Sequence, residues 1–242
     1  MKILCIIPIY NEESRLKSLI EKILQFKKVD LRKIDFMMIN NGSNDGTKKL
    51  LKDLGLNFIT LRKNKGIGYS LLLGLKLAAR KNYDVLIHMA GNDKMTPFDI
   101  DKMIDPIINH NFDYVCGSRF LEKKNFKTNP LFRKVSIRLM SMFFSVIFKK
   151  KITDATCGFR AFKIKKLIRY FNFLNKKKFY TYGYEYYSYG KILLSKNINS
   201  CEVSVEMNYP KSGKYSKIRP IIDWYPIIWG YIESVYDRIS FD

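Results

Sequence analysis

The chain has 242 residues, and its 44 lysines and arginines against 22 aspartates and glutamates give a formal net charge of +22 at pH 7. This length fits one large domain or two small ones. The 47% hydrophobic and 14% aromatic content excludes a disordered or collagen-like chain. The four cysteines lie far apart without a Cys-x-x-Cys pair, so we expect no disulfide framework or zinc site and a reducing, cytoplasmic setting.

The positive charge narrows the classes of partner. A strongly basic chain attracts nucleic acid, anionic lipid or phosphorylated ligands. The sequence has no RNA-binding aromatic signature, zinc finger or basic-helix zipper, so no nucleic-acid partner is expected. The first residues predict a buried strand rather than a secretory signal. No run of about 18 uncharged apolar residues is present, so we expect no membrane-spanning helix.

Short apolar runs alternate with amphipathic stretches over the first half of the chain. Because strands and helices alternate at this spacing, we expect a mostly parallel, doubly wound α/β sheet with helices on both faces. Asn11 precedes two acidic residues and is expected to cap the first helix. Strands are predicted at residues 2–8, 36–40, 57–60, 85–89 and 114–118, and helices at 12–26, 47–54, from 63–68 to about 81, and 97–110.

Ligands of such sheets bind beyond the carboxyl ends of the strands. The loops at these ends are residues 8–12, 40–46, 62–68 and 90–97, where glycine, asparagine, aspartate and lysine concentrate. We therefore expect the binding site at this edge of the sheet.

The second half of the chain has a different pattern. Residues 135–148 carry one charge, Arg138, and are flanked by basic residues at 133–134 and 149–151. This segment is either a core helix or an interfacial helix on a membrane surface, and the sequence leaves both open. Further predictions are a Tyr-rich segment leading into a helix, a strand, and an aromatic tail of the kind found at membrane–water boundaries, at residues 179–197, 200–207 and 218–236.

Six short motifs follow one another along the chain. They are IPIYNEE at 7–13, NGSNDGT at 41–47, NKGIG at 64–68, GSR at 117–119, DATCGFR at 154–160 and GKYSK at 213–217. On these motifs the chain resembles the family 2 glycosyltransferases of the GT-A fold, and among them the dolichyl- or polyprenyl-phosphate sugar (mannose) synthases. The resemblance implies a single domain over 1–242, with a nucleotide-sugar-binding half at 1–120 and an acceptor-binding half at 121–242 that holds the candidate interfacial helix at 133–149.

The resemblance also implies a donor, an acceptor and a set of binding residues. The reaction is an inverting transfer of a sugar from a nucleoside-diphosphate sugar to a polyprenyl phosphate. Tyr10 is expected to stack on the base, Glu12 to accept a proton from the nucleoside, and Asn41 to contact the base edge. The implied donor-binding residues are Pro8, Tyr10, Asn11, Glu12, Asn40, Asn41, Asp45, Lys65, Gly66, Ala90, Gly91, Asn92, Lys211 and Lys217.

Two positions depart from the family's pattern. Asn40 and Asn41 stand where the family usually carries two aspartates, so base selectivity is expected to differ. The family's Asp-x-Asp metal motif aligns with Ala90-Gly91-Asn92, and Mg²⁺ normally needs a carboxylate as well as phosphate oxygens. Asn92 and the adjacent Asp93 are therefore the remaining candidates for holding Mg²⁺ or Mn²⁺.

Lys94 suggests a second way to balance the diphosphate, because a fixed ammonium near the β-phosphate replaces part of a metal's charge. The hypothesis is that a metal is weakly bound or dispensable. The leaving diphosphate would then be neutralised by Lys94, Arg119, Lys211 and Lys217.

The acceptor decides whether a general base is needed. A sugar hydroxyl requires one, and Asp154 and Glu185 are the candidates. A lipid monophosphate, with a second pKa of roughly 6, is already anionic and needs only positive charge and positioning. The resemblance implies that Arg160 clamps a phosphate and that Asp154 orients the phosphate or the sugar. The catalytic candidates are therefore Asp154, Arg119, Arg160 and Lys94.

Three functions stay open at this stage. The favoured one is transfer to a polyprenyl phosphate by an enzyme bound peripherally at the inner, cytoplasmic face of an anionic membrane. The second is transfer to a sugar hydroxyl in cell-surface polysaccharide or lipopolysaccharide synthesis. The third is a non-catalytic nucleotide-binding homologue, for which the substitutions at Asn40, Asn41, Ala90 and Asn92 argue.

Overall fold

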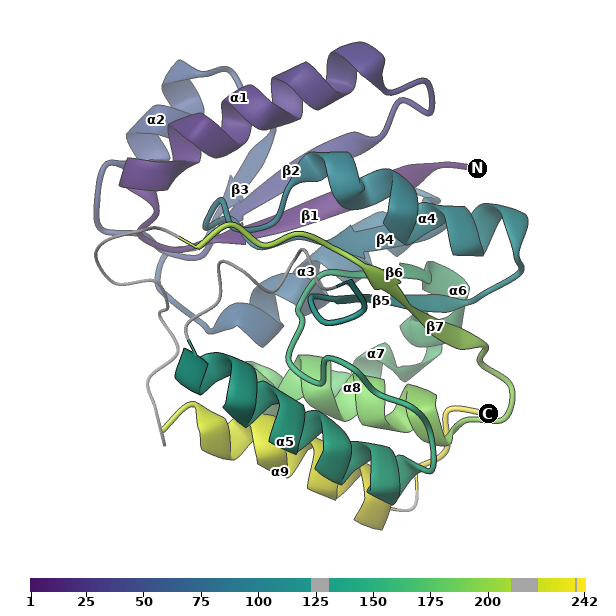
Figure 1. Cartoon of the computed structure of the whole chain (residues 1–242). Coiled ribbons are helices and arrows are strands. Elements are labelled where there is room, and N and C mark those ends of the chain that lie inside the picture. Colours follow the sequence, from purple (N-terminus) through teal and green to yellow (C-terminus); the bar gives the residue numbers. More distant parts are fainter. Residues whose placement is uncertain (123–130, 210–221, 238) are drawn as a thin grey trace.

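A seven-stranded sheet runs through the part of the chain that the computed structural model describes, residues 1–122, 131–209, 222–237 and 239–242. The strand order is β3-β2-β1-β4-β6-β5-β7 (Figure 1). Six of these strands are parallel to one another, and β6 lies antiparallel between β4 and β5. The strands are β1 (Ile3–Ile9), β2 (Asp35–Asn40), β3 (Phe58–Thr60), β4 (Val85–His88), β5 (Tyr114–Ser118), β6 (Arg160–Lys163) and β7 (Ser200–Ser204).

Helices cover both faces of this sheet (Figure 1). On one side lie α1 (Glu13–Val29), α2 (Thr47–Asp53), the short η1 (Pro97–Asp99) and α4 (Ile100–Asn109). On the other lie α3 (Ile67–Arg80), α6 (Ile164–Leu167), η3 (Ile168–Tyr170), α7 (Phe171–Leu174), η4 (Lys177–Phe179) and α8 (Gly183–Leu194). A further layer, α5 (Leu131–Phe148) and α9 (Trp224–Tyr236), packs on the outer side of α8.

The predicted α/β architecture is confirmed. Strand β1 is a continuous apolar run because it is covered on both faces, as parallel strands in such sheets are. Helix α1 buries the leucine and isoleucine stripe that its periodicity predicts. The sheet is continuous across residue 120, since β6 from the second half of the chain lies between two strands of the first half.

Three sequence predictions need correction. The antiparallel β6 was not expected, because it is only four residues long and both its end residues are basic. Helix α5 begins at Leu131 instead of 135, so the basic residues 133–134 are in its first turn. Asn11 does not cap α1: it has φ +51°, and its side-chain oxygen accepts a hydrogen bond from the backbone N–H of Asn44 instead.

Small residues set the spacing between α8 and α9. A Cβ atom added at Gly190 of α8 would lie 2.0 Å from the Ser234 hydroxyl oxygen of α9. A Cβ atom at Gly183, the first residue of the same helix, would lie 3.5 Å from its nearest neighbour, which is an ordinary contact. The two helices therefore pack closely only where a side chain is absent.

We expect Gly190→Ala to lower the free energy of unfolding by about 1–3 kcal/mol, the usual cost of overpacking a buried contact. Gly183→Ala is the matched control, and it should be neutral or slightly stabilising because alanine is the better helix former. Chemical denaturation of both variants measures the difference. Equal stability of the two variants would contradict the close packing of α8 on α9.

Candidate active site

The loops after β1 and β2 are hydrogen-bonded to each other at the carboxyl edge of the sheet. The backbone N–H of Asn11 donates to the Ser43 hydroxyl at 3.0 Å, and the backbone N–H of Glu12 donates to the Thr47 hydroxyl at 3.1 Å. Asp45 accepts from the backbone N–H of Thr47, which closes a local turn just before α2. Strand β1 pairs with β2 on one side and with β4 on the other, so this edge is a topological switch point, where such sheets bind ligands.

Asn41 connects the loop after β2 to the loop after β3. It is buried, its side-chain oxygen accepts from the backbone N–H of Lys65 at 3.0 Å, and its amide nitrogen donates to the Asn64 side chain at 3.1 Å. Asn40, also buried, accepts from the backbone N–H of Ser43. A carboxylate at position 41 lacks the amide donor, which is a structural reason for asparagine where the family usually has aspartate.

Gly66 lets the segment before α8 approach this loop. The residue has φ +91°, and an added Cβ atom would lie 2.1 Å from the carbonyl oxygen of Tyr180. The backbone N–H of Tyr69 donates to the same oxygen, and the Tyr69 and Tyr180 rings meet edge to face. Sequence positions more than a hundred residues apart therefore meet at this edge of the sheet.

The loop after β4 does not present the carboxylates that a divalent cation needs. Ala90 has no ligating side-chain atom, and the Asn92 side-chain oxygen accepts from the backbone N–H of Lys94. Asp93 has φ +57° and turns to α1, where its carboxylate accepts from the Ser18 hydroxyl at 2.7 Å and the Lys22 ammonium at 2.8 Å. Among the residues that the structure describes, no three His, Cys, Asp or Glu side chains are grouped to hold a metal. The loop therefore does not fit the metal that the family's motif implies.

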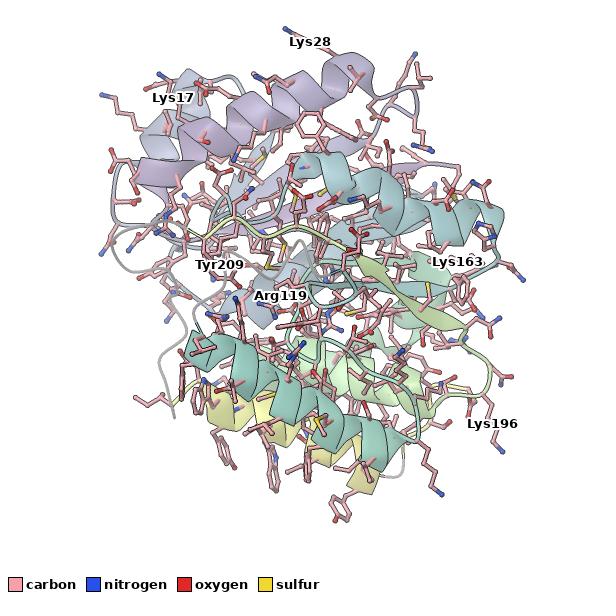
Figure 2. The ribbon with its side chains drawn as sticks, viewed as in Figure 1. Lys17, Lys28, Arg119, Lys163, Lys196 and Tyr209 are labelled. Carbon is pink, nitrogen blue, oxygen red and sulfur yellow. The ribbon has the colours of Figure 1, made fainter. Side chains whose placement is uncertain are left out.

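Lys94 lies in a group of cations around the Tyr209 ring. Its side chain is nearly buried, and its ammonium lies 5.3 Å from the Tyr209 ring centroid, while the Arg133 guanidinium lies 5.7 Å from the same centroid. Arg119 donates to the Tyr209 hydroxyl at 2.8 Å, and Figure 2 shows these two residues close together. We call these three cations and Tyr209, together with Arg15, whose positive charge acts on Lys94, the cation cluster.

Charge repulsion within the cation cluster lowers the pKa of Lys94. Burial, then the positive charges of Arg133 and Arg15, lower the pKa of Lys94 to about 8, and the nearby Glu12 carboxylate only partly opposes this. An anion bound beside Lys94 would relieve the repulsion. The cation cluster is thus a site prepared for negative charge.

Asp154 and Arg119 form a fully buried, two-point ion pair. The Arg119 Nε atom lies 2.6 Å from one carboxylate oxygen and the Nη2 atom lies 2.7 Å from the other, while Nη2 also donates to the Thr156 hydroxyl at 2.6 Å. Both oxygens of Asp154 are therefore occupied. This geometry indicates that Asp154 positions Arg119. It argues against a role of Asp154 as a free general base.

Arg160 and Glu185 lie together in the interior, between β6 and α8. Arg160 donates to the Tyr114 hydroxyl, and its guanidinium lies 4.5 Å from the Tyr189 ring centroid and 4.0 Å from a Glu185 carboxylate oxygen. Burial raises the pKa of Glu185 to about 7, although Arg160 opposes the rise. The prediction that Arg160 clamps a phosphate gains no support from this position.

Sequence reasoning missed three members of the cation cluster. Tyr209 follows β7, and its place at the carboxyl edge becomes visible only once β7 is known to run parallel to β5. Arg133 is expected from the sequence only as the flank of a candidate interfacial helix, and Arg15 lies two residues beyond the motif at 7–13. Two predicted donor-binding residues, Lys211 and Lys217, lie outside the described residues, as does the motif at 213–217.

Comparison with known proteins gives a consistent result. The model of the family "Glycosyl transferase family 2" matches residues 4–171. A UDP-N-acetylglucosamine–dolichyl-phosphate N-acetylglucosaminyltransferase of Methanococcus voltae is 31% identical over an alignment of 222 residues that covers 84% of this chain and 84% of that one. The polyprenol monophosphomannose synthase of Mycolicibacterium smegmatis is 25% identical over 166 residues, 66% of this chain and 61% of that one.

The fold also has close counterparts among solved structures. Glucosyl-3-phosphoglycerate synthase of Mycobacterium tuberculosis, crystallised with Mn²⁺, UDP-glucose and phosphoglyceric acid, superposes with a TM-score of 0.67 at 13% identity. The match covers 99% of this chain and 81% of that one. This likeness confirms the predicted GT-A fold.

Asp154→Asn should lower the free energy of unfolding by about 3–5 kcal/mol, because it leaves the buried Arg119 guanidinium without its counter-charge. Chemical denaturation measures the change. Asp53→Asn, at the exposed end of α2, is the control and should change the stability by less than about 0.5 kcal/mol. An Asp154→Asn protein as stable as the wild type would show that the pair does not hold the site together.

The raised pKa of Glu185 predicts a pH-dependent stability. The folded state holds the Glu185 proton up to a pH of about 7 while the unfolded chain releases it near 4.5, so this group loses its stabilising contribution as pH rises through that interval. Glu185→Gln should remove roughly 3 kcal/mol of the stability change between pH 4.5 and 7. Denaturation curves of both proteins at several pH values measure the difference, and parallel pH profiles would contradict the shift.

Proposed function

Because the chain belongs to glycosyl transferase family 2 and is a glycosyltransferase, we propose that it transfers a sugar, with inversion, from a nucleoside-diphosphate sugar to a polyprenyl phosphate. The observation that carries this proposal is the cation cluster at the carboxyl edge of the sheet. A reaction between two phosphorylated substrates brings together several negative charges, and the cation cluster supplies the opposite charge where such sheets bind ligands.

The nucleoside is proposed to occupy the joined loops after β1, β2 and β3. Pro8 and Tyr10 are partly exposed there, and Asn41 and Lys65 fix the loops relative to each other. Gly66 admits close backbone approach. The proposed roles of these residues are base stacking for Tyr10 and backbone contacts to the nucleoside for the rest of the loop.

Two observations favour a phosphate acceptor over a sugar hydroxyl. The two candidate general bases are both engaged: Asp154 is paired with Arg119, and Glu185 is buried beside Arg160. The Methanococcus voltae relative is also named for a dolichyl-phosphate substrate, and the Mycolicibacterium smegmatis relative for a polyprenol monophosphomannose product. An anionic phosphate attacks the anomeric carbon without a base if it is held in line.

The outer face of α5 and α9 supports an acceptor that is embedded in a membrane. Helix α5 buries Ile137, Phe144 and Phe148 on its inner side, which shows that it is packed on the domain and is not a fully buried core helix. Its outer side is apolar and, with the outer side of α9, points away from the sheet (Figure 2). The exposed residues of this apolar face are Leu131, Phe132, Val135, Leu139, Met142, Phe143, Val146, Tyr225, Trp229 and Tyr236.

Basic residues surround this apolar face, among them Lys134, Lys149 and Lys151. Each of these lysines contributes about 1 kcal/mol to the free energy of binding when it lies near an anionic lipid surface. Within the described ranges, none of the helices has the length and apolar character required to cross a bilayer. From the apolar face and its basic flanks we propose a peripheral location, with α5 and α9 in the headgroup region of the inner, cytoplasmic membrane face.

The transfer itself is tested with UDP-N-acetylglucosamine as the first donor, followed by GDP- and dTDP-sugars, and with a polyprenyl phosphate in mixed micelles. We expect a sugar-phospho-lipid that mass spectrometry detects, and an anomeric configuration opposite to that of the donor. An oligosaccharide panel is the control acceptor. Transfer to an oligosaccharide without transfer to the lipid would contradict the proposed acceptor, and donor binding without transfer to either would favour a non-catalytic homologue.

Membrane docking is tested by placing two acidic residues on the apolar face. Leu139→Glu with Val146→Glu should lower flotation with anionic liposomes at least about tenfold, because two exposed side chains that would enter the headgroup region become charged. Leu24→Glu with Val29→Glu makes the same change on exposed positions of α1 and should leave flotation unchanged. Equal flotation of the two double variants would contradict docking through α5 and α9.

A further inference from the structure

The loop after β4 holds Lys94 in a fixed position. The Lys94 backbone N–H donates to the Asn92 side chain, and its carbonyl oxygen accepts from the backbone N–H of Asn208 at 2.8 Å. One residue further on, Met95 forms a β-bridge with Met207. The loop is thus fastened to the segment that carries Tyr209, on whose ring the Lys94 ammonium lies. The backbone of Lys94 is held on both sides, which limits how far its ammonium can move from the Tyr209 ring.

The carboxylate beside Lys94 is used for a different purpose. Asp93 is bonded to Ser18 and Lys22 of α1, so its negative charge holds the loop against that helix and is drawn away from the cation cluster. The loop thereby presents an ammonium where the aligned family motif presents carboxylates. In the family's motif, carboxylates bind a metal cation, and the cation binds the anionic diphosphate. In this loop the ammonium is suited to bind the anion directly.

Arg133 completes the charge that one ammonium lacks. A divalent cation carries two charges and Lys94 carries one, so a single lysine replaces only half of the metal's charge. The Arg133 guanidinium lies over the same Tyr209 ring, and Arg119 reaches that ring's hydroxyl. The charged groups that act on Lys94 are Arg133, Arg15, Glu12 and Arg119, three cations against one carboxylate.

We propose that Lys94, supported by Arg133, neutralises the negative charge of the departing nucleoside diphosphate in place of a divalent cation. Donor binding and transfer then need no metal. The inference rests on the proposed function. In the transfer, a bond forms between an oxygen of the lipid phosphate and the anomeric carbon, and the bond from that carbon to the β-phosphate oxygen breaks. The electron pair leaves with the nucleoside diphosphate, which gains one negative charge beside Lys94. No proton transfer is required.

The first experiment measures the binding of UDP, and of GDP and dTDP, to the full chain by titration calorimetry with and without a chelator. The wild type should bind with the same affinity in both conditions. Lys94→Met, which keeps the length of the side chain and removes its charge, should weaken binding at least about tenfold, and Lys94→Arg should recover most of it. Lys102→Met, a lysine on α4 paired with Asp99 and outside the cation cluster, is the matched control and should bind like the wild type. A melting curve of each variant shows that it is folded.

A second set of variants rebuilds the family's motif. Ala90→Asp with Asn92→Asp, combined with Lys94→Met, should bind UDP only when Mn²⁺ is present, and electron paramagnetic resonance should detect bound Mn²⁺ in this variant and none in the wild type. This result would show that the Lys94 ammonium and a metal held by aspartates at positions 90 and 92 can substitute for each other.

The outcomes separate the two proposals. Loss of UDP binding by the wild type under chelator, restored by Mn²⁺, would overturn the role of Lys94 and leave the transferase proposal intact. Unchanged binding by Lys94→Met would do the same. If the wild type binds none of the three nucleoside diphosphates under any condition, the proposed function fails and this inference fails with it.

Discussion

The ion pair between Arg119 and Asp154 is the contact on which the rest of the site depends. It is fully buried and two-pointed, and it joins the end of β5 to the segment that leads into β6. Because Asp154 fixes the guanidinium, Arg119 can hold the Tyr209 hydroxyl in place. The Tyr209 ring then supports both Lys94 and Arg133. One buried carboxylate thus helps to place Lys94 and Arg133, through Arg119 and Tyr209.

Grouping several cations, some of them buried, lowers the stability of the folded protein unless an anion is bound beside them. Helix α5 connects the cation cluster to the apolar face, and this connection indicates which anion the cluster binds. Arg133, in its first turn, lies over Tyr209, while Leu139 and Val146 further along are exposed on the outer side. An amphiphile with a phosphate head and an apolar tail matches this arrangement: the head would meet the cations, and the tail would stay in the membrane on which α5 is proposed to lie.

The sequence predicted the sheet well because its strands are continuous apolar runs separated by amphipathic helices, a pattern set by burial on both faces. It missed β6, whose four residues begin at Arg160 and are too short to show a pattern. The loops of the site were predicted because they follow strand ends, but Tyr209 was not, since the direction of β7 depends on its pairing with β5. The sequence alone does not determine whether Arg133 faces a lipid surface or the Tyr209 ring, because either orientation leaves the same basic residue at the start of an apolar helix.

The most direct test is a crystal structure of the complex with UDP, grown in the presence of Mn²⁺. We predict that oxygens of the β-phosphate lie within hydrogen-bonding distance, about 2.7–3.2 Å, of the Lys94 ammonium, with the Arg133 guanidinium also facing the diphosphate and no metal bound. A Mn²⁺ ion that bridges the diphosphate to Asn92 or Asp93, with Lys94 turned away, would contradict the central claim.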